Sequence, residues 1–219
     1  YTPFTARLTG LLKEGDNLIT VKVDGSENPE IPPFGGQIDY LTYAGIYRDV
    51  WLQVTDSVSI ANLKIETSNE LSDAKGVLVK GVIANPTDVP VSGTALVELC
   101  NVDGTVLHQQ TVAVSGKGFS ASFAELGGLH LWELDAPQLY LVRTTLGNGD
   151  QLSTRFGFRT ARFTTEGFFL NDKHVKIRGL NRHQSFPYVG YAMGQRVQAK
   201  DADVMKDVLK CNLVRTSHY

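Results

Sequence analysis

The sequence has no long apolar run and no excess of basic residues. No run within its 219 residues approaches the roughly 20 apolar residues that a membrane-spanning helix needs, so we expect no membrane partner. The formal net charge is -2, and the lysines and arginines form no cluster. Because binding to a phosphate backbone requires a basic surface, we expect no nucleic-acid partner either.

Cysteine is scarce, and metal-ligating or phosphate-binding motifs are missing. The chain has 2 cysteines, Cys100 and Cys211, which lie far apart in apolar contexts and are expected to be buried free thiols. They favour a reducing compartment, the cytoplasm, only slightly. His, Cys, Asp and Glu show no spacing typical of a zinc or calcium site, and no glycine-rich loop follows a strand. We therefore expect no metal and no cofactor.

The chain is instead rich in short segments in which apolar and polar residues alternate, so we expect a mainly β protein. Seven such segments recur at the spacing typical of a sandwich: residues 62–67, 76–85, 94–101, 105–114, 119–126, 139–146 and 151–160. Asp103–Gly104 and Asn148–Gly149 supply the left-handed backbone of tight hairpins. We predict an immunoglobulin-like β-sandwich over residues 57–160, similar in architecture only, because the paired cysteines and central Trp of antibody domains are missing.

Residues 1–56 show three further strand-like segments, at residues 4–12, 18–24 and 44–54. Three strands leave edges unpaired and bury little apolar area. We therefore interpret residues 1–56 as the carboxyl-terminal part of a β domain, and the chain as a piece of a longer protein. Trp51 and Trp132 are expected to fill cores.

The pattern changes after Arg162. Residues 167–175 predict a hairpin turning at Asn171–Asp172, and an apolar strand from Val175 leads to Asn181, Arg182 and His183. Residues 201–210 have helical apolar spacing, and a second apolar strand begins at Asn212. Strand, helix and strand in this order predict the first βαβ unit of a (β/α)₈ barrel or of a doubly wound sheet, over residues 161–219.

Both strands of this unit lead into polar residues, which is where such folds carry functional side chains. The first is followed by Asn181, Arg182 and His183, for which a solvated loop remains the alternative. The second leads to Arg215 and His218, and a strand-end histidine is often structural. An inward-facing arginine requires a carboxylate; none is evident in the sequence, so we expect one from a later strand.

Two pairs of carboxylates, Glu66 with Glu70 and Asp201 with Asp203, are candidates for a catalytic acid/base pair. Their positions on a sandwich strand and at a helix start favour solvated or capping roles instead.

Five motifs, in order along the whole chain, resemble glycoside hydrolase family 2, the β-galactosidase, β-glucuronidase and β-mannosidase family. The motifs are Tyr1–Asp24, Gly45–Val50, Leu131–Tyr140 with Phe156–Arg159, Gly179–His183 and Asn212–Tyr219. The resemblance implies the end of a sugar-binding jelly roll over residues 1–56. It also implies that the sandwich is the family's immunoglobulin-like domain and that residues 161–219 begin its TIM barrel.

The family hydrolyses terminal β-glycosides with retention, by double displacement at two glutamates whose carboxyl groups lie about 5–5.5 Å apart. Both come from later barrel strands, so the resemblance places them beyond Tyr219. It also makes Arg215 and His218 supporting catalytic residues, Arg215 by orienting the nucleophilic carboxylate. Asp39, Asn181, His183 and His218 become the candidates for binding sugar hydroxyls, Asn181 on the strength of its place in the strand-end cluster.

The substrate remains open between two branches of the family. Arg215–Tyr219 and Tyr43–Gly45 resemble the β-glucuronidases, whereas Asn181–Tyr188 looks more like bacterial β-galactosidases. We expect a β-linked oligosaccharide or glycoside as the substrate partner, and a terminal β-D-galactoside in particular. A β-glucuronidase and a non-catalytic carbohydrate-binding sandwich are the alternatives, and a homo-oligomer is left open.

Overall fold

The computed structural model describes residues 3–31, 43–86 and 91–216. These form two compact units. One unit combines Tyr1–Trp51 with Arg178–Tyr219, and the other consists of Leu52–Ile177.

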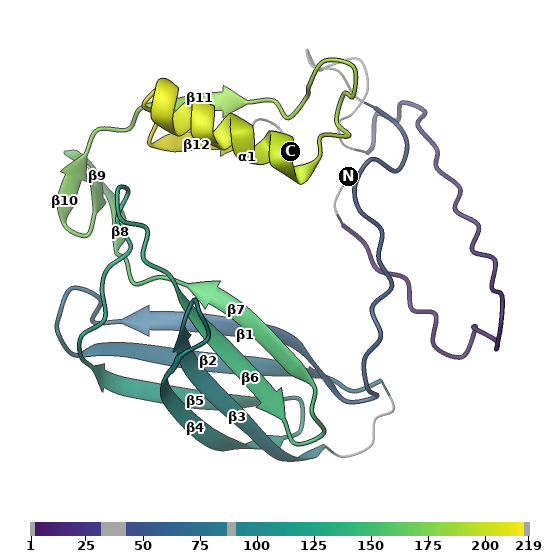
Figure 1. Ribbon diagram of the computed structural model, residues 1–219, viewed down its shortest axis with the longest axis horizontal. Helices are drawn as coiled ribbons and strands as arrows, with labels where there is room; N and C mark the ends of the chain where they lie inside the picture. The colour runs from purple at the N-terminus through teal and green to yellow at the C-terminus, as the bar shows by residue number, and fades with distance from the viewer. Residues whose placement is uncertain (1–2, 32–42, 87–90, 217–219) are drawn as a thin grey trace. The chain divides into compact units, whose positions relative to one another are not determined.

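The second unit is built on a seven-stranded antiparallel sheet (Figure 1). Its strands are β1 (Ser59–Ser68), β2 (Lys75–Ala84), β3 (Ser92–Asn101), β4 (Val106–Ser115), β5 (Gly118–Leu126), β6 (Tyr140–Leu146) and β7 (Gln151–Phe156). They lie in the order β1-β2-β5-β4-β3-β6-β7, and the outer strands β1 and β7 contact each other, so the sheet is nearly closed. All seven predicted strands are confirmed, as is the mainly β fold.

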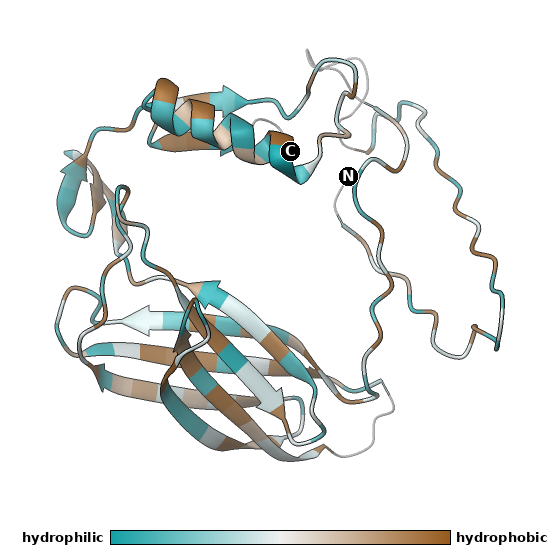
Figure 2. Ribbon diagram, in the orientation of Figure 1, coloured by the Kyte–Doolittle hydropathy of each residue, from teal (hydrophilic) through white to brown (hydrophobic). Residues whose placement is uncertain are grey.

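Alternation along the strands places one set of side chains in a single core. On β6, Tyr140, Val142, Thr144 and Leu146 are buried, while the residues between them are partly exposed. Figure 2 shows the corresponding bands of brown and teal along the strands of this sheet. Because successive side chains on a strand point to opposite faces, the period of two in the sequence is sufficient to define this core.

A small three-stranded sheet follows, with β9 between β10 and β8. Its strands are β8 (Ala161–Thr164), β9 (Gly167–Leu170) and β10 (Lys173–Val175). The predicted hairpin is confirmed: β9 and β10 pair across Asn171 and Asp172, whose φ angles of 51° and 60° are those of a tight hairpin turn.

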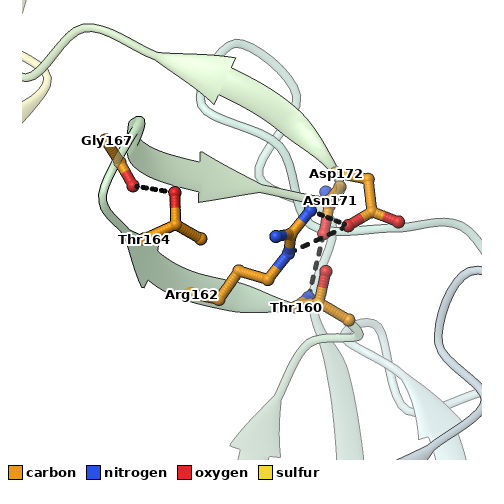
Figure 3. Close-up of polar contacts among 6 residues, drawn as sticks. All are labelled: Thr160, Arg162, Thr164, Gly167, Asn171 and Asp172. Carbon is orange, nitrogen blue, oxygen red and sulfur yellow. Dashed lines mark hydrogen bonds and ion pairs between the residues drawn. The ribbon is translucent and has the colours of Figure 1, made fainter.

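Asn171 joins this hairpin to the sandwich (Figure 3). Its backbone N–H donates to Thr160 O at 2.9 Å, and its Oδ1 accepts from the Thr160 N–H at 3.0 Å. Its Nδ2 donates to Trp132 O at 3.0 Å. Arg162 of β8 forms an ion pair with the other turn residue: its Nη2 lies 3.1 Å from Asp172 Oδ1.

The first unit contains the βαβ arrangement. Strands β11 (Gly179–Arg182) and β12 (Leu213–Thr216) are parallel, and the helix α1 (Gln195–Asp203) continues as a π-helix over Val204–Val208. The parallel pair is confirmed. The helix begins at Gln195, before the predicted start at residue 201. The prediction missed this part because the first six residues of the helix are mostly polar and show no apolar periodicity.

The strands predicted within residues 1–56 are absent from the described residues 3–31 and 43–56. Apolar side chains there are exposed: Phe4 by 88%, Leu18 by 94% and Trp51 by 76%. The reason is that a strand requires a hydrogen-bonded neighbour, and these segments pair with none of the described residues. Trp51 is therefore not in a core, while the assignment of residues 1–56 to a jelly roll stays a prediction.

The two cysteines are free, as predicted; Cys100 is buried and Cys211 is partly exposed. Burial raises the pKa of the Cys100 thiol, which keeps it protonated and unreactive.

Candidate active site

The carboxyl ends of β11 and β12 lie side by side because the two strands are parallel. Asn181 on β11 is the direct partner of Arg215 on β12. The Arg215 Nη1 group donates to Asn181 Oδ1 at 3.5 Å. The predicted convergence of polar groups at the two strand ends is thus present for these two residues.

Arg182, the next residue on β11, binds the helix instead. Its Nη2 and Nε lie 2.7 and 3.1 Å from Asp201 Oδ2, and Nη2 also donates to Gln198 Oε1 at 2.9 Å. The Arg182 side chain is 16% exposed. Since neighbouring residues on a strand project to opposite faces, Asn181 and Arg215 lie on the face directed away from α1.

The remaining sequence candidates have different positions. His183 follows β11 directly and is exposed. Asp39 and His218 lie outside the described residues, so their roles stay predictions.

Arg215 is exposed, and no carboxylate among the described residues forms an ion pair with it. A guanidinium has five N–H donors, so Arg215 can donate to Asn181 and to a carboxylate at the same time. The geometry is compatible with the predicted acid from a later strand.

One member of each carboxylate pair noted in the sequence forms a structural ion pair. Glu66 pairs with Lys64 at 2.7 Å and Lys80 at 2.9 Å, and hydrogen bonds from Lys64 and then Lys80 lower the pKa of Glu66 to about 2. A general acid needs a raised pKa, which is the opposite shift. Asp201 is occupied by Arg182.

Sequence reasoning did not separate Arg182 from the polar residues on either side of it. The available signal was the alternation of the strand, which sends Arg182 to the face where Leu180 and Val214 contribute apolar side chains.

Among the described residues, no group of three or more His, Cys, Asp and Glu side chains could hold a metal ion. None of the described helices is both long and apolar enough to cross a membrane.

Comparison with known proteins bears directly on this architecture. The family model "Glycosyl hydrolases family 2" matches residues 58–159, and "Glycosyl hydrolases family 2, TIM barrel domain" matches residues 162–219. Of the two alternatives for the parallel strands, the barrel is therefore confirmed.

Relatives match along the entire chain. A beta-galactosidase from Rhizobium meliloti is 56% identical over 100% of the chain and 30% of its own length. A beta-galactosidase from Thermoanaerobacterium thermosulfurigenes is 41% identical over 100% of the chain and 32% of its own length. The chain thus spans about a third of the length of these curated relatives.

Solved structures agree. A putative beta-galactosidase from Bacteroides fragilis has a TM-score of 0.81 and 25% identity, covering 90% of this chain and 32% of that one. The beta-glucuronidase of Parabacteroides merdae has a TM-score of 0.77 and 28% identity, covering 90% of this chain and 25% of that one. The sandwich, the parallel strands that follow it and these matches along the entire chain have one explanation: the chain belongs to glycosyl hydrolases family 2.

Proposed function

We propose that the protein containing this chain is a retaining exo-β-glycosidase that hydrolyses terminal β-D-galactosides. The observation that carries the proposal is the contact between Arg215 and Asn181 at the carboxyl ends of the first two barrel strands. The names of the 56% and 41% identical relatives support the sugar.

In this proposal the chemistry is a double displacement. One carboxylate attacks the anomeric carbon while a second carboxylic acid protonates the leaving oxygen, and the second then activates the water that releases the sugar. Both glutamates come from later strands of the barrel, beyond this chain. The small share of the relatives' length that the chain spans supports this assignment.

Arg215 orients the nucleophile in this scheme. A guanidinium beside a carboxylate lowers the pKa of that carboxylate and keeps it ionised, as a nucleophile must be. Asn181 Oδ1 accepts from one N–H of Arg215 and so restricts the orientation of the guanidinium. Asp39, Asn181, His183 and His218 would bind the sugar hydroxyls.

The test is hydrolysis of nitrophenyl β-galactoside and nitrophenyl β-glucuronide by the full-length protein. We expect turnover of the galactoside, with the β-anomer as the first product observed by NMR. Arg215→Ala should reduce kcat about 100- to 1000-fold, as for loss of one preorganised donor. The matched control is Arg178→Ala, at the opposite end of β11 and bonded to Lys210 O, which should retain activity.

A β-glucuronidase is the second candidate, favoured by the likeness to the Parabacteroides merdae enzyme. Turnover of the glucuronide in place of the galactoside would establish it, and turnover of neither would overturn the proposal. The remaining alternative, a non-catalytic carbohydrate-binding sandwich, does not account for the parallel strands and α1 that follow the sandwich.

A further inference from the structure

The segment Tyr43–Arg48 contacts a loop that is far away in the sequence. Arg48 Nη1 donates to the backbone oxygen of Tyr191. The ring of Tyr43 lies 4.8 Å from that of Tyr191, and the ring of Tyr47 lies 5.7 Å from it, both in edge-to-face geometry. Tyr191 is only 5% exposed, so this segment covers a buried aromatic side chain.

The loop itself has a defined shape. Phe186 and Gly190 exchange two backbone hydrogen bonds, of 3.1 and 3.0 Å, and the Ala192 N–H donates to Val189 O at 3.0 Å. Gly190 has a φ of 53°, and a Cβ there would meet the Tyr43 ring at 3.1 Å. A side chain at residue 190 would therefore be strained and crowded.

The position of this loop connects it to the candidate active site. It leaves the carboxyl end of β11 just after His183 and ends at Gly194, the N-cap of α1. Arg182, the last residue of β11 before the loop, binds Asp201 of α1 after it. The two elements that the loop connects are thus joined by an ion pair, and Tyr43–Arg48 contacts the loop itself at Gly190 and Tyr191.

We infer that Tyr43–Arg48 is a latch that fixes the loop at residues 184–193, and that Arg48 is a positioning residue for sugar binding through His183. This step rests on the proposed function. The guanidinium of Arg48 lies over the Tyr47 ring, 5.3 Å from its centroid, while it donates to Tyr191 O. A planar guanidinium makes both contacts at once, whereas a lysine ammonium lacks the planar stacking face.

The first experiment is hydrogen–deuterium exchange on the full-length protein and its Arg48→Ala and Arg48→Lys variants. We expect exchange of the Gly190 and Ala192 amides to accelerate about tenfold in Arg48→Ala, and less in Arg48→Lys. Tyr43→Leu, which removes a ring contact but keeps Arg48, should have a similar local effect. Arg7→Ala, an exposed arginine of the same unit, is the control and should change nothing. Unchanged exchange at residues 186–193 in Arg48→Ala would overturn the latch.

The second readout is steady-state kinetics on nitrophenyl β-galactoside. Loss of a positioning residue for sugar binding raises KM, here by about tenfold, with kcat nearly unchanged. A purely structural role would lower the amount of active enzyme and leave KM alone, and that result would overturn the link to sugar binding. A wild-type protein that hydrolyses neither glycoside would contradict the proposed function, while the exchange data would still decide the latch.

Discussion

Asn171 combines a left-handed backbone with a buried side chain that joins the hairpin to two other segments. Its φ is 51°, and it is 7% exposed. Asparagine tolerates this backbone better than most residues because its short polar side chain bonds locally. Here those bonds, to the Thr160 N–H and Trp132 O, also satisfy backbone groups that would otherwise lack a partner.

We therefore expect Asn171→Ala to destabilise the chain by about 3 kcal/mol, since two buried hydrogen bonds are lost. Asn69→Ala is the matched control: Asn69 has nearly the same φ, 53°, but is exposed, so about 1 kcal/mol of backbone strain is expected there. Urea unfolding, followed by Trp132 fluorescence in a Trp51→Phe background, measures both. Equal losses would show that backbone strain, and not the side-chain bonds, is the cause.

Thr144 carries a polar group into the sandwich core. It is 0% exposed, and among the described residues no group forms a hydrogen bond with its Oγ1. Thr144→Val keeps the shape and removes the unpaired hydroxyl, so we expect a gain of about 1 kcal/mol in the free energy of unfolding. Thr145→Val, where Oγ1 accepts from Gln151 at 3.0 Å, should give no gain. A loss of stability in Thr144→Val would show that the hydroxyl has a partner.

At the scale of the element, strands β3 and β6 are joined by an ion pair as well as by backbone bonds. Glu98 and Arg143 are direct partners in the register, and Nε and Nη2 of Arg143 lie 2.7 and 2.9 Å from the two carboxylate oxygens. Hydrogen bonds from Arg143 lower the pKa of Glu98 below its ordinary value of 4.5, against the effect of burial. A carboxylate whose pKa is lower in the folded state than in the unfolded state stabilises the fold at pH values above its unfolded-state pKa. This contribution is lost as the pH falls through its folded-state pKa.

We expect the wild-type chain to lose stability as the pH falls below about 4.5, and Glu98→Gln to lose less in that window. The variant should be less stable than wild type at neutral pH. Urea midpoints across the pH range measure this. Adding about 1 M NaCl should weaken the corresponding contribution of Glu66, whose side chain is more exposed than that of Glu98, more than it weakens the contribution of Glu98. If the urea midpoints of wild type and Glu98→Gln fall equally as the pH is lowered, Glu98 does not contribute to the acid-dependent loss of stability.

The elements differ in how far local sequence could predict them. Alternation located the seven sandwich strands because each has one face packed on or against the core and has paired neighbours. The same alternation at residues 18–24 produced no strand, because pairing depends on a partner that the segment's own sequence does not contain. The helix start at Gln195 was missed because Gln195–Lys200 is mostly polar.

The candidate site shows the same limit. Asn181 and Arg215 could be expected to meet, since both end parallel strands. The contact of Arg182 with Asp201 depends on the turn of α1 that faces β11. That of Arg48 with Tyr191 joins segments 143 residues apart. No local pattern in the sequence contains either piece of information.

At the scale of the whole molecule, the two units differ in the core they contain. The sandwich unit has a core of buried residues drawn from β1 to β6, including Val79, Leu99 and Val142 at 0% exposure, and side chains of β7 pack against it. In the other unit, the buried apolar residues among those described are Tyr191 and Met193. Because folding must overcome the conformational entropy of the backbone, a unit with so little core depends on further contacts.

We expect residues 52–177 to fold on their own, because a domain with its own hydrophobic core and paired strands satisfies the requirements for independent stability. The separate fragment should unfold cooperatively in urea with a dispersed amide NMR spectrum, whereas residues 178–219 alone should show the circular dichroism of an unfolded chain. Thr144→Val and Asn171→Ala should shift the midpoint of the 52–177 fragment in the same directions as in the complete chain. A fragment with strand-like circular dichroism but poorly dispersed amide NMR signals would show that the sandwich core requires contacts from outside its own unit.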